Sequence, residues 1–206
     1  MAEDRSLGMS RLARPFAHLN LRHNPFGELE HETFVALAVV DVAEFAKLLN
    51  RPSVALQFVG RHGRGKTTRL SVLHALFATA PYTQVYPDEP VPSFSAAPLH
   101  FVDSVDHLAT TKRRRLFACA DRIVVTTHVD LSAEFANAGF GVTTIRVEGV
   151  SRELLAEIVR RRIVHARRGP GPIPSVGNTE IDQLIANFGD DLRTIESVLY
   201  ERFQSL

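Results

Sequence analysis

The most informative segment for chemistry is residues 60–67, which read Gly-Arg-His-Gly-Arg-Gly-Lys-Thr and match the pattern G-x-x-x-x-G-K-[ST]. Glycines suit such a loop because its backbone N–H groups must approach a polyphosphate closely, in conformations that a β-carbon would obstruct. Lys66 would reach the β- and γ-phosphates, and the Thr67 hydroxyl would be a ligand of Mg²⁺. The alternative is a glycine-rich surface turn, and the motif favours nucleotide binding. The residues expected to hold the nucleotide are Gly60, Gly63, Arg64, Gly65, Lys66, Thr67 and Thr68.

A phosphate loop of this kind needs a carboxylate on a second strand to hold the magnesium ion, and Asp103 suits that role because it follows the apolar run 99–102. We therefore predict a Mg²⁺ site between Thr67 and Asp103. In hydrolysing enzymes of this type a glutamate usually follows the aspartate, whereas the next residue here is Ser104, which predicts slow turnover. Asp106 could act as a displaced base or could cap the following helix, and capping is the favoured interpretation.

A further polar group ends the apolar run 123–125, which continues as Thr126, Thr127 and His128. The Thr127 hydroxyl could sense the γ-phosphate or orient water, but threonine is also common in strands because of its branched β-carbon. Both interpretations of Thr127 stay open. The nine histidines show no spacing typical of metal ligands near carboxylates, so we assign no transition-metal site.

The elements around these residues follow from hydrophobic patterning. Residues 54–59 are an apolar run typical of a buried strand, and Leu70, Leu73, Leu76 and Phe77 follow the loop at helical spacing. Further strands are expected at 83–86, 99–103, 123–127 and 143–147, with helices near 106–119 and 131–138 and a proline-rich connection at 87–98. Strands that alternate with helices predict an α/β fold, a three-layer αβα core with a five-stranded parallel sheet.

The pattern becomes all-helical towards the end of the chain. Ser151 is a suitable N-cap for a helix that ends at residues 167–169, before a proline-rich and glycine-rich break, and helices are expected at 179–186 and 191–203. Before the sheet, residues 33–49 predict one largely buried helix. The expected division is an N-terminal segment at 1–50, a nucleotide-binding core at 51–149 and a helical subdomain at 150–206.

Composition limits the classes of function. The chain has 206 residues, 45% of them apolar and 23% charged, which is typical of a folded domain. No stretch approaches the roughly 18–20 apolar residues that cross a bilayer, so we expect a cytoplasmic protein without membrane contact. The single cysteine, Cys119, lies in an apolar run and is expected to pack. A net charge of +1 is too small for the whole surface to bind nucleic acid.

Three basic clusters remain, at residues 112–115, 160–162 and 167–168. Each lies on or beside an expected helix, where a solvated face with partners such as Glu157 and Arg161 is the favoured interpretation. Contact with a nucleic-acid backbone through 112–115 and 160–168, docking of an acidic protein partner, and an arginine offered to a neighbouring subunit in a homo-oligomer stay open.

Together these motifs resemble the AAA+ superfamily of P-loop ATPases, from about Asn20 to the end of the chain. The phosphate loop, residues 101–108, Thr127 and residues 189–193 occur in that family's order, and residues 24–27 resemble a segment of small bacterial members that serve transposition and secretion. The resemblance implies that residues 150–206 form a lid whose Arg193 reaches the γ-phosphate. Ser104 and the proline-rich connection at 87–98 depart from the family's pattern.

The resemblance implies an ATP-binding protein with Mg²⁺ as cofactor, in which slow hydrolysis drives a conformational change. The alternative is a nucleotide-gated binding module without appreciable hydrolysis, which is suggested by Ser104 at the position where hydrolysing enzymes usually have a glutamate. A GTPase is a weaker alternative: residues 127–130 faintly resemble [NT]-K-x-D, but the lysine is missing. A small-molecule kinase also stays open. An unidentified protein partner and a homo-oligomer are further expectations.

Overall fold

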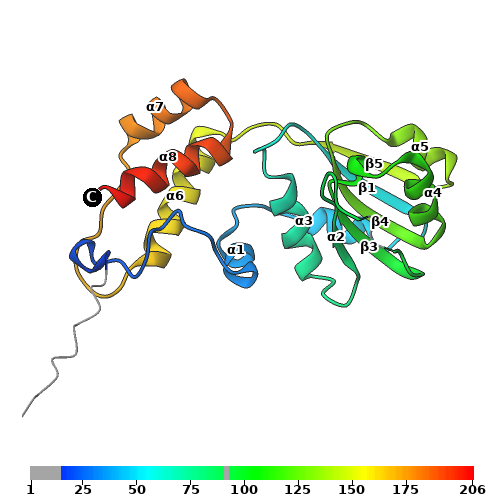
Figure 1. The fold of residues 1–206 in the computed structure, drawn as a ribbon, viewed down its shortest axis with the longest axis horizontal. Helices are drawn as coiled ribbons and strands as arrows, with labels where there is room; N and C mark the ends of the chain where they lie inside the picture. Colours follow the sequence, from blue (N-terminus) through cyan, green and yellow to red (C-terminus); the bar gives the residue numbers. More distant parts are fainter. Residues whose placement is uncertain (1–14, 91–92) are drawn as a thin grey trace, which may run out of the picture.

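The computed structural model describes residues 15–90 and 93–206 and divides them between a sheet with flanking helices and a separate group of helices (Figure 1). The strands are β1 (Val54–Val59), β2 (Tyr82–Gln84), β3 (Ala97–Asp103), β4 (Ala120–Thr127) and β5 (Gly141–Arg146). The α-helices are α1 (His31–Leu37), α2 (Ala43–Leu48), α3 (Lys66–Ala75), α4 (Thr110–Ala118), α5 (Ser132–Asn137), α6 (Arg152–Ala166), α7 (Asn178–Phe188) and α8 (Leu192–Gln204). Two short 3-10 helices are η1 (Ala17–Leu19) and η2 (Val105–His107).

The five strands form one parallel sheet in the order β2-β3-β4-β1-β5. This confirms the predicted fold class and all five expected strands, with small differences at their ends. In the register of the sheet, Val59 at the end of β1 lies opposite Thr127 at the end of β4. The neighbouring strands β3, β4 and β1 run parallel, so their carboxyl ends lie at the same edge of the sheet. Ligands of open parallel sheets usually bind at this edge.

Both faces of the sheet are covered by helices, as the buried strands require. Alternate residues of β1 point to opposite faces, so Leu56 and Phe58 pack on one side and Ala55 on the other. The first side contains Leu70 and Leu73 of α3 and the second side contains apolar residues of α4 and α5. The αβα layering places the amino end of α3 at the carboxyl edge of the sheet (Figure 1).

A helical bundle formed by α6, α7 and α8 lies beside the sheet, with α1 between them in the view of Figure 1. Ser151 caps α6 as predicted, because its hydroxyl accepts a hydrogen bond from the Leu154 amide at 3.2 Å. The buried core of the bundle also includes Leu21 and Phe26 from the N-terminal segment. Among the helices of the described residues, none is long and apolar enough to cross a membrane.

The prediction of one buried helix over residues 33–49 is wrong. The structure has two short helices there, α1 and α2, and neither contains a buried residue. Between them the backbone turns extended at Ala38, whose carbonyl accepts a hydrogen bond from Arg161 at 2.8 Å. Asp41 then accepts a hydrogen bond from the Ala43 amide at 2.9 Å. The contact between Asp41 and the Ala43 amide, together with the valines between residues 39 and 42, therefore favours a break in the helix over the continuous helix that the hydrophobic spacing predicts.

Candidate functional site

The phosphate loop, residues 60–67, leaves the end of β1 and leads directly into α3. Gly63 and Gly65 have φ values of 72° and 80°, in the left-handed region that favours glycine. A β-carbon on Gly60 would lie 2.5 Å from the Val147 carbonyl oxygen, so this glycine allows β1 and the segment after β5 to run close together. The loop therefore depends on its glycines for both turning and close packing.

Lys66 lies at the start of α3 and is only 7% exposed. Its ammonium group donates hydrogen bonds to the carbonyl oxygens of Gly60 at 2.6 Å and Arg61 at 2.7 Å. Burial lowers the pKa of Lys66, and the nearby carboxylates of Asp106 and Asp103 act in the opposite direction. The ammonium group thus lies inside the curve of the loop, bonded to backbone carbonyls of the loop itself.

Asp103 ends β3 and is 2% exposed. Its carboxylate accepts hydrogen bonds from the hydroxyls of Thr67, at 3.2 Å, and Thr126. The same Thr126 hydroxyl accepts a hydrogen bond from the Ser104 amide at 2.7 Å, which fixes the turn after β3. Thr126 therefore orients the carboxylate, because β4 lies between β1 and β3 in the sheet.

Thr67 and Asp103 bring together a hydroxyl oxygen and a carboxylate oxygen at the edge of the groove described below. Hard oxygen ligands of this kind suit Mg²⁺, which usually takes one or two protein ligands and keeps its remaining positions for water and phosphate oxygens. Burial raises the pKa of the adjacent Tyr82 to about 12, with a further contribution from Asp103, so its phenol stays protonated beside the carboxylate. The donor set at this edge fits a magnesium ion.

Asp106 does not cap the helix that follows it, so the favoured sequence interpretation is wrong. It lies in η2, and α4 begins later, after Ala109, without a side-chain cap. The Asp106 carboxylate instead accepts a hydrogen bond from the His128 ring at 2.8 Å, from Nδ1 to Oδ2. Burial acts to raise the pKa of Asp106, but the hydrogen bond and the charge of His128 act in the opposite direction, and the pKa is lowered.

The Thr127 hydroxyl is engaged in a local turn. It donates to the Val129 carbonyl at 2.8 Å and accepts from the Val129 amide at 3.1 Å. The side chain is fully buried, and the residue that faces the groove at this end of β4 is His128. The structure thus places Thr127 near the other site residues while directing its hydroxyl to the backbone.

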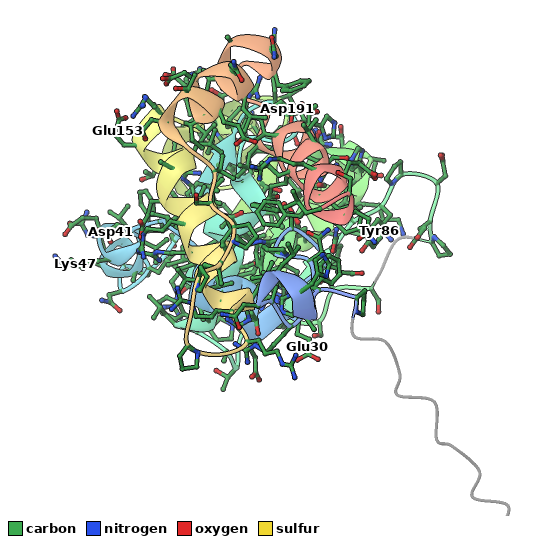
Figure 2. All side chains as sticks on the ribbon, turned by 90° about the vertical axis from the view of Figure 1, so that its left-hand side faces the viewer. Glu30, Asp41, Lys47, Tyr86, Glu153 and Asp191 are labelled. Carbon is green, nitrogen blue, oxygen red and sulfur yellow. The ribbon has the colours of Figure 1, made fainter. Side chains whose placement is uncertain are left out.

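The helical bundle reaches the phosphate loop where α8 begins. Asp190 forms an ion pair with Arg64 of the loop, and the Leu192 amide donates to the Gly63 carbonyl at 3.2 Å. Asp191, at the start of α8 in Figure 2, lies so close that a β-carbon on Gly63 would be 2.1 Å from its carboxylate. The loop and the amino end of α8 therefore form one continuous surface.

Two hollows meet at the phosphate loop. The first, here called the phosphate groove, runs along the loop and the carboxyl ends of β3 and β4. The polar and charged residues that line it include Lys66, Thr67, Asp103, His128 and Arg193. The second, here called the apolar hollow, lies between α1, the loop and the bundle. It is lined mainly by aliphatic and aromatic side chains, among them Leu29, Phe34, Val40, Leu154 and Ile158. Gly63, Arg64, Gly65 and Thr68 border both hollows.

Four of the eight arginines in the basic clusters have side-chain partners within the described residues. Arg161 pairs with Glu157 at 2.8 Å, as the helical spacing predicts, and Arg160 bonds to the same carboxylate. Arg162 donates to the carbonyl oxygens of Pro25 and Gly27 from the N-terminal segment. Arg113 pairs with Glu134 of α5, so these side chains hold the fold together.

Sequence patterns did not single out Thr126, Asp190 or the ring of His128 as site residues. The only sequence signal for Thr126 and His128 was their position at the end of an expected strand, next to Thr127. Asp190 lay within the late segment that resembles the family's lid, but its pairing with Arg64 joins residues 126 positions apart. Only the folded chain shows which carboxylate contacts which cation.

Comparison with models of protein families gives no match, and comparison with curated protein sequences gives none either. Among solved structures, NtrX from Brucella abortus in complex with ADP is similar over 80% of this chain and 51% of its own, at 16% identity and a TM-score of 0.53. A mutant of RuvB from Thermotoga maritima is similar over 84% of this chain and 61% of its own, at 14% identity and a TM-score of 0.54. This chain thus spans less than two thirds of either structure. At such identities the likeness concerns the fold alone, and it agrees with the predicted three-layer αβα fold.

Proposed function

We propose that this chain binds ATP together with Mg²⁺ at the phosphate loop and hydrolyses it slowly, with the bound nucleotide setting the position of the helical bundle. The residues proposed to hold the phosphates are Gly60, Gly63, Arg64, Gly65, Lys66, Thr67 and Thr68. Nucleotide binding agrees with the fold shared with NtrX, whose structure holds ADP. The proposed nucleotide-binding core is residues 51–149 and the proposed lid is residues 150–206. The segment 1–50 includes residues 1–14, which lie outside the described residues.

The observation that carries the proposal is the position of Lys66. Its ammonium group is buried within the loop and bonds only to the Gly60 and Arg61 carbonyls, so no carboxylate forms an ion pair with it among the described residues. A surface turn would leave such a side chain in solvent, and a structural lysine at this depth would normally pair with a carboxylate. A buried cation at the amino end of a helix, beside an open groove, suits a polyphosphate.

The two hollows match the two parts of a nucleotide. The phosphate groove carries the polar groups, and the apolar hollow offers aliphatic and aromatic walls to a planar base. Thr67 and Asp103 would hold Mg²⁺, which would neutralise charge on the phosphate oxygens. Arg193, exposed at the start of α8 and lining the groove, would contact the terminal phosphate and so link it to the bundle.

Replacement of Lys66 tests this proposal. Lys66→Met keeps the apolar stem and removes the charge, and it should weaken binding of a fluorescent ATP analogue by about 100-fold or more, since hydrogen bonds to charged groups are each worth about 1.5–3 kcal/mol. Lys47→Met is the matched control, because Lys47 is an exposed lysine that pairs with Glu44 on α2 and lies at the outer edge of the molecule in Figure 2. Similar affinities for the Lys66→Met variant and the parent chain would remove the basis of the proposal.

A nucleotide-gated switch without hydrolysis is the second candidate. It is favoured by Ser104, which follows Asp103 in a left-handed conformation with φ of 60° and offers no carboxylate to activate water. Phosphate release separates the two candidates. A measurable rate that is lost in Asp103→Ala supports the enzyme, and tight binding without release supports the switch.

The contacts of Asp130 argue against recognition of a guanine base by this residue. Its carboxylate accepts hydrogen bonds from Gln57 at 2.8 Å and from the Ser132 amide at 2.9 Å, so it is already committed to joining β1 to the segment before α5. Competition between ATP and GTP for the fluorescent analogue measures the preference directly, and we expect ATP to compete better. A protein partner and assembly into a homo-oligomer remain proposals, with the bundle as the part that would change its position.

A further inference from the structure

A histidine and a carboxylate form a pair at the end of the phosphate groove, next to the position where Ser104 replaces a glutamate. His128 directly follows β4, and its Nδ1 lies 2.8 Å from the Asp106 carboxylate. The other ring nitrogen, Nε2, is buried and has no hydrogen-bond partner among the described residues, and the same holds for the second oxygen of Asp106. His62 of the phosphate loop covers the pair, with its ring centroid 4.0 Å from that of His128.

This arrangement selects one tautomer of a neutral imidazole. A carboxylate accepts hydrogen bonds, so Asp106 is satisfied when Nδ1 of His128 carries the proton. Nε2 then keeps its lone pair and can accept a proton. An unpartnered, buried lone pair costs free energy, which is the kind of feature that calls for a role beyond packing.

We propose that His128 is the general base of the ATP hydrolysis proposed above and that Asp106 is its positioning residue. Nε2 of His128 takes a proton from water while the water oxygen forms a bond to the terminal phosphorus. The bond from that phosphorus to the bridging oxygen breaks, its electron pair stays on the departing ADP, and inorganic phosphate is the second product. This inference rests on the proposed function, because it needs a triphosphate in the phosphate groove.

Access to Nε2 gives His62 a part in the same step. His62 is exposed on the outer part of the phosphate loop, so its ring can leave His128 without disturbing the core. A polyphosphate that attracts Lys66 would weaken its bonds to the loop carbonyls of Gly60 and Arg61, which lie two residues and one residue before His62. Movement of His62 with the loop would expose Nε2 to water when the nucleotide is in place.

The charged and titratable groups around the pair come from five elements. His62 belongs to the loop, Lys66 to α3, Asp103 to β3, His107 to η2 beside Asp106, and Arg193 to α8. The pKa of His62 is lowered, first by His128 and then by burial, Lys66, Arg193 and His107, so the His62 ring that covers the pair favours its neutral form.

Kinetics of two variants test the roles. His128→Gln keeps an amide that can donate to Asp106 but removes the base, and it should lower kcat about 100-fold or more with the Kd for the ATP analogue unchanged within about threefold. Asp106→Asn should lower kcat similarly, because its amide can donate to Nδ1 and move the proton to Nε2. His18→Gln, an exposed histidine of η1, is the matched control and should leave both constants unchanged.

The tautomer is measurable without nucleotide. In protein labelled with ¹⁵N at the imidazole nitrogens, a two-bond ¹H–¹⁵N correlation spectrum at about pH 8 should show His128 protonated at Nδ1 only, with the signals assigned by their loss in His128→Gln. Asp106→Asn should move the proton to Nε2. Any other protonation pattern of His128 in the parent chain would overturn the proposal.

The outcomes separate this inference from the proposed function. If the parent chain does not bind the ATP analogue, the proposed function fails and this inference fails with it. If the analogue binds and phosphate release is absent, or release is unchanged in His128→Gln, the inference alone fails. Binding with release that falls in both His128→Gln and Asp106→Asn, together with the Nδ1 tautomer, supports it.

Discussion

The ion pair between Arg64 and Asp190 leads to a prediction about nucleotide affinity. The Arg64 side chain is 14% exposed and that of Asp190 is 44% exposed. Arg64, a loop residue proposed to bind phosphate, is thus already paired with a carboxylate of the bundle. A triphosphate and Asp190 must compete for the same guanidinium group. Asp190→Asn keeps the size of the side chain and removes its charge, and we expect it to tighten ATP binding.

The magnitude follows from the exposure of the pair. Exposed ion pairs contribute about 0–1 kcal/mol, and hydrogen bonds to charged groups with little solvent contact about 1.5–3 kcal/mol. Arg64 is largely buried and Asp190 is nearly half exposed, so we take the free energy of the Arg64–Asp190 ion pair as about 1 kcal/mol. Since about 1.4 kcal/mol corresponds to a tenfold change in affinity, the Kd should fall roughly fivefold. The gain should shrink as the salt concentration rises, because screening weakens the pair in the parent chain.

The assay is titration of the fluorescent ATP analogue with the parent chain, with Asp190→Asn and with Asp182→Asn. Asp182 is the matched control, since it is also an exposed carboxylate that pairs with an arginine, Arg152 at 2.6 Å, on the bundle surface. We expect the control to leave the Kd unchanged. Unchanged or weaker binding by Asp190→Asn would refute competition and would mean that the pair does not oppose phosphate at Arg64.

Two further predictions concern stability. Burial raises the pKa of Glu196 above its ordinary value of 4.5, and Arg162 and Arg193 act in the opposite direction. The folded protein therefore binds this proton more tightly than the unfolded chain does. The stabilisation that this proton gives the fold is lost as the pH rises through the pKa of the folded state. Glu196→Gln should therefore raise Tm at about pH 8 and give no gain near pH 4, and a pH-independent change in Tm would contradict this account. Arg162→Ala should lower the free energy of unfolding by about 3 kcal/mol in urea titrations, because the Pro25 and Gly27 carbonyls lose a charged donor at 2.8 and 2.9 Å. Arg160→Ala, on the exposed side of α6, should change it by less than about 0.5 kcal/mol, and equal effects of the two substitutions would show that Arg162 is not what ties the N-terminal segment to the bundle.

Local patterns were sufficient wherever a property depends on neighbours in the sequence. The run Val54–Val59 is apolar enough to be a strand in the middle of a sheet, and the spacing of Gly60, Gly65 and Lys66 predicts a phosphate loop in any arrangement of the remaining chain. Ser151 caps α6 because its hydroxyl and the Leu154 amide are only three residues apart. The same reasoning failed for residues 33–49, where the long-range hydrogen bond from Arg161 to the Ala38 carbonyl helps to end the first helix.

The tertiary structure decided which side chains meet. Sheet order places β4 between β1 and β3, and this position brings the hydroxyl of Thr126 to Asp103 and the ring of His128 to Asp106. Neither contact has a sequence period, because the paired residues are more than 20 positions apart and lie on or shortly after two strands, β3 and β4, whose ends meet only when the sheet forms. A phosphate loop can thus be predicted from eight consecutive residues, whereas the partners of its cations and carboxylates depend on how distant strands and helices pack.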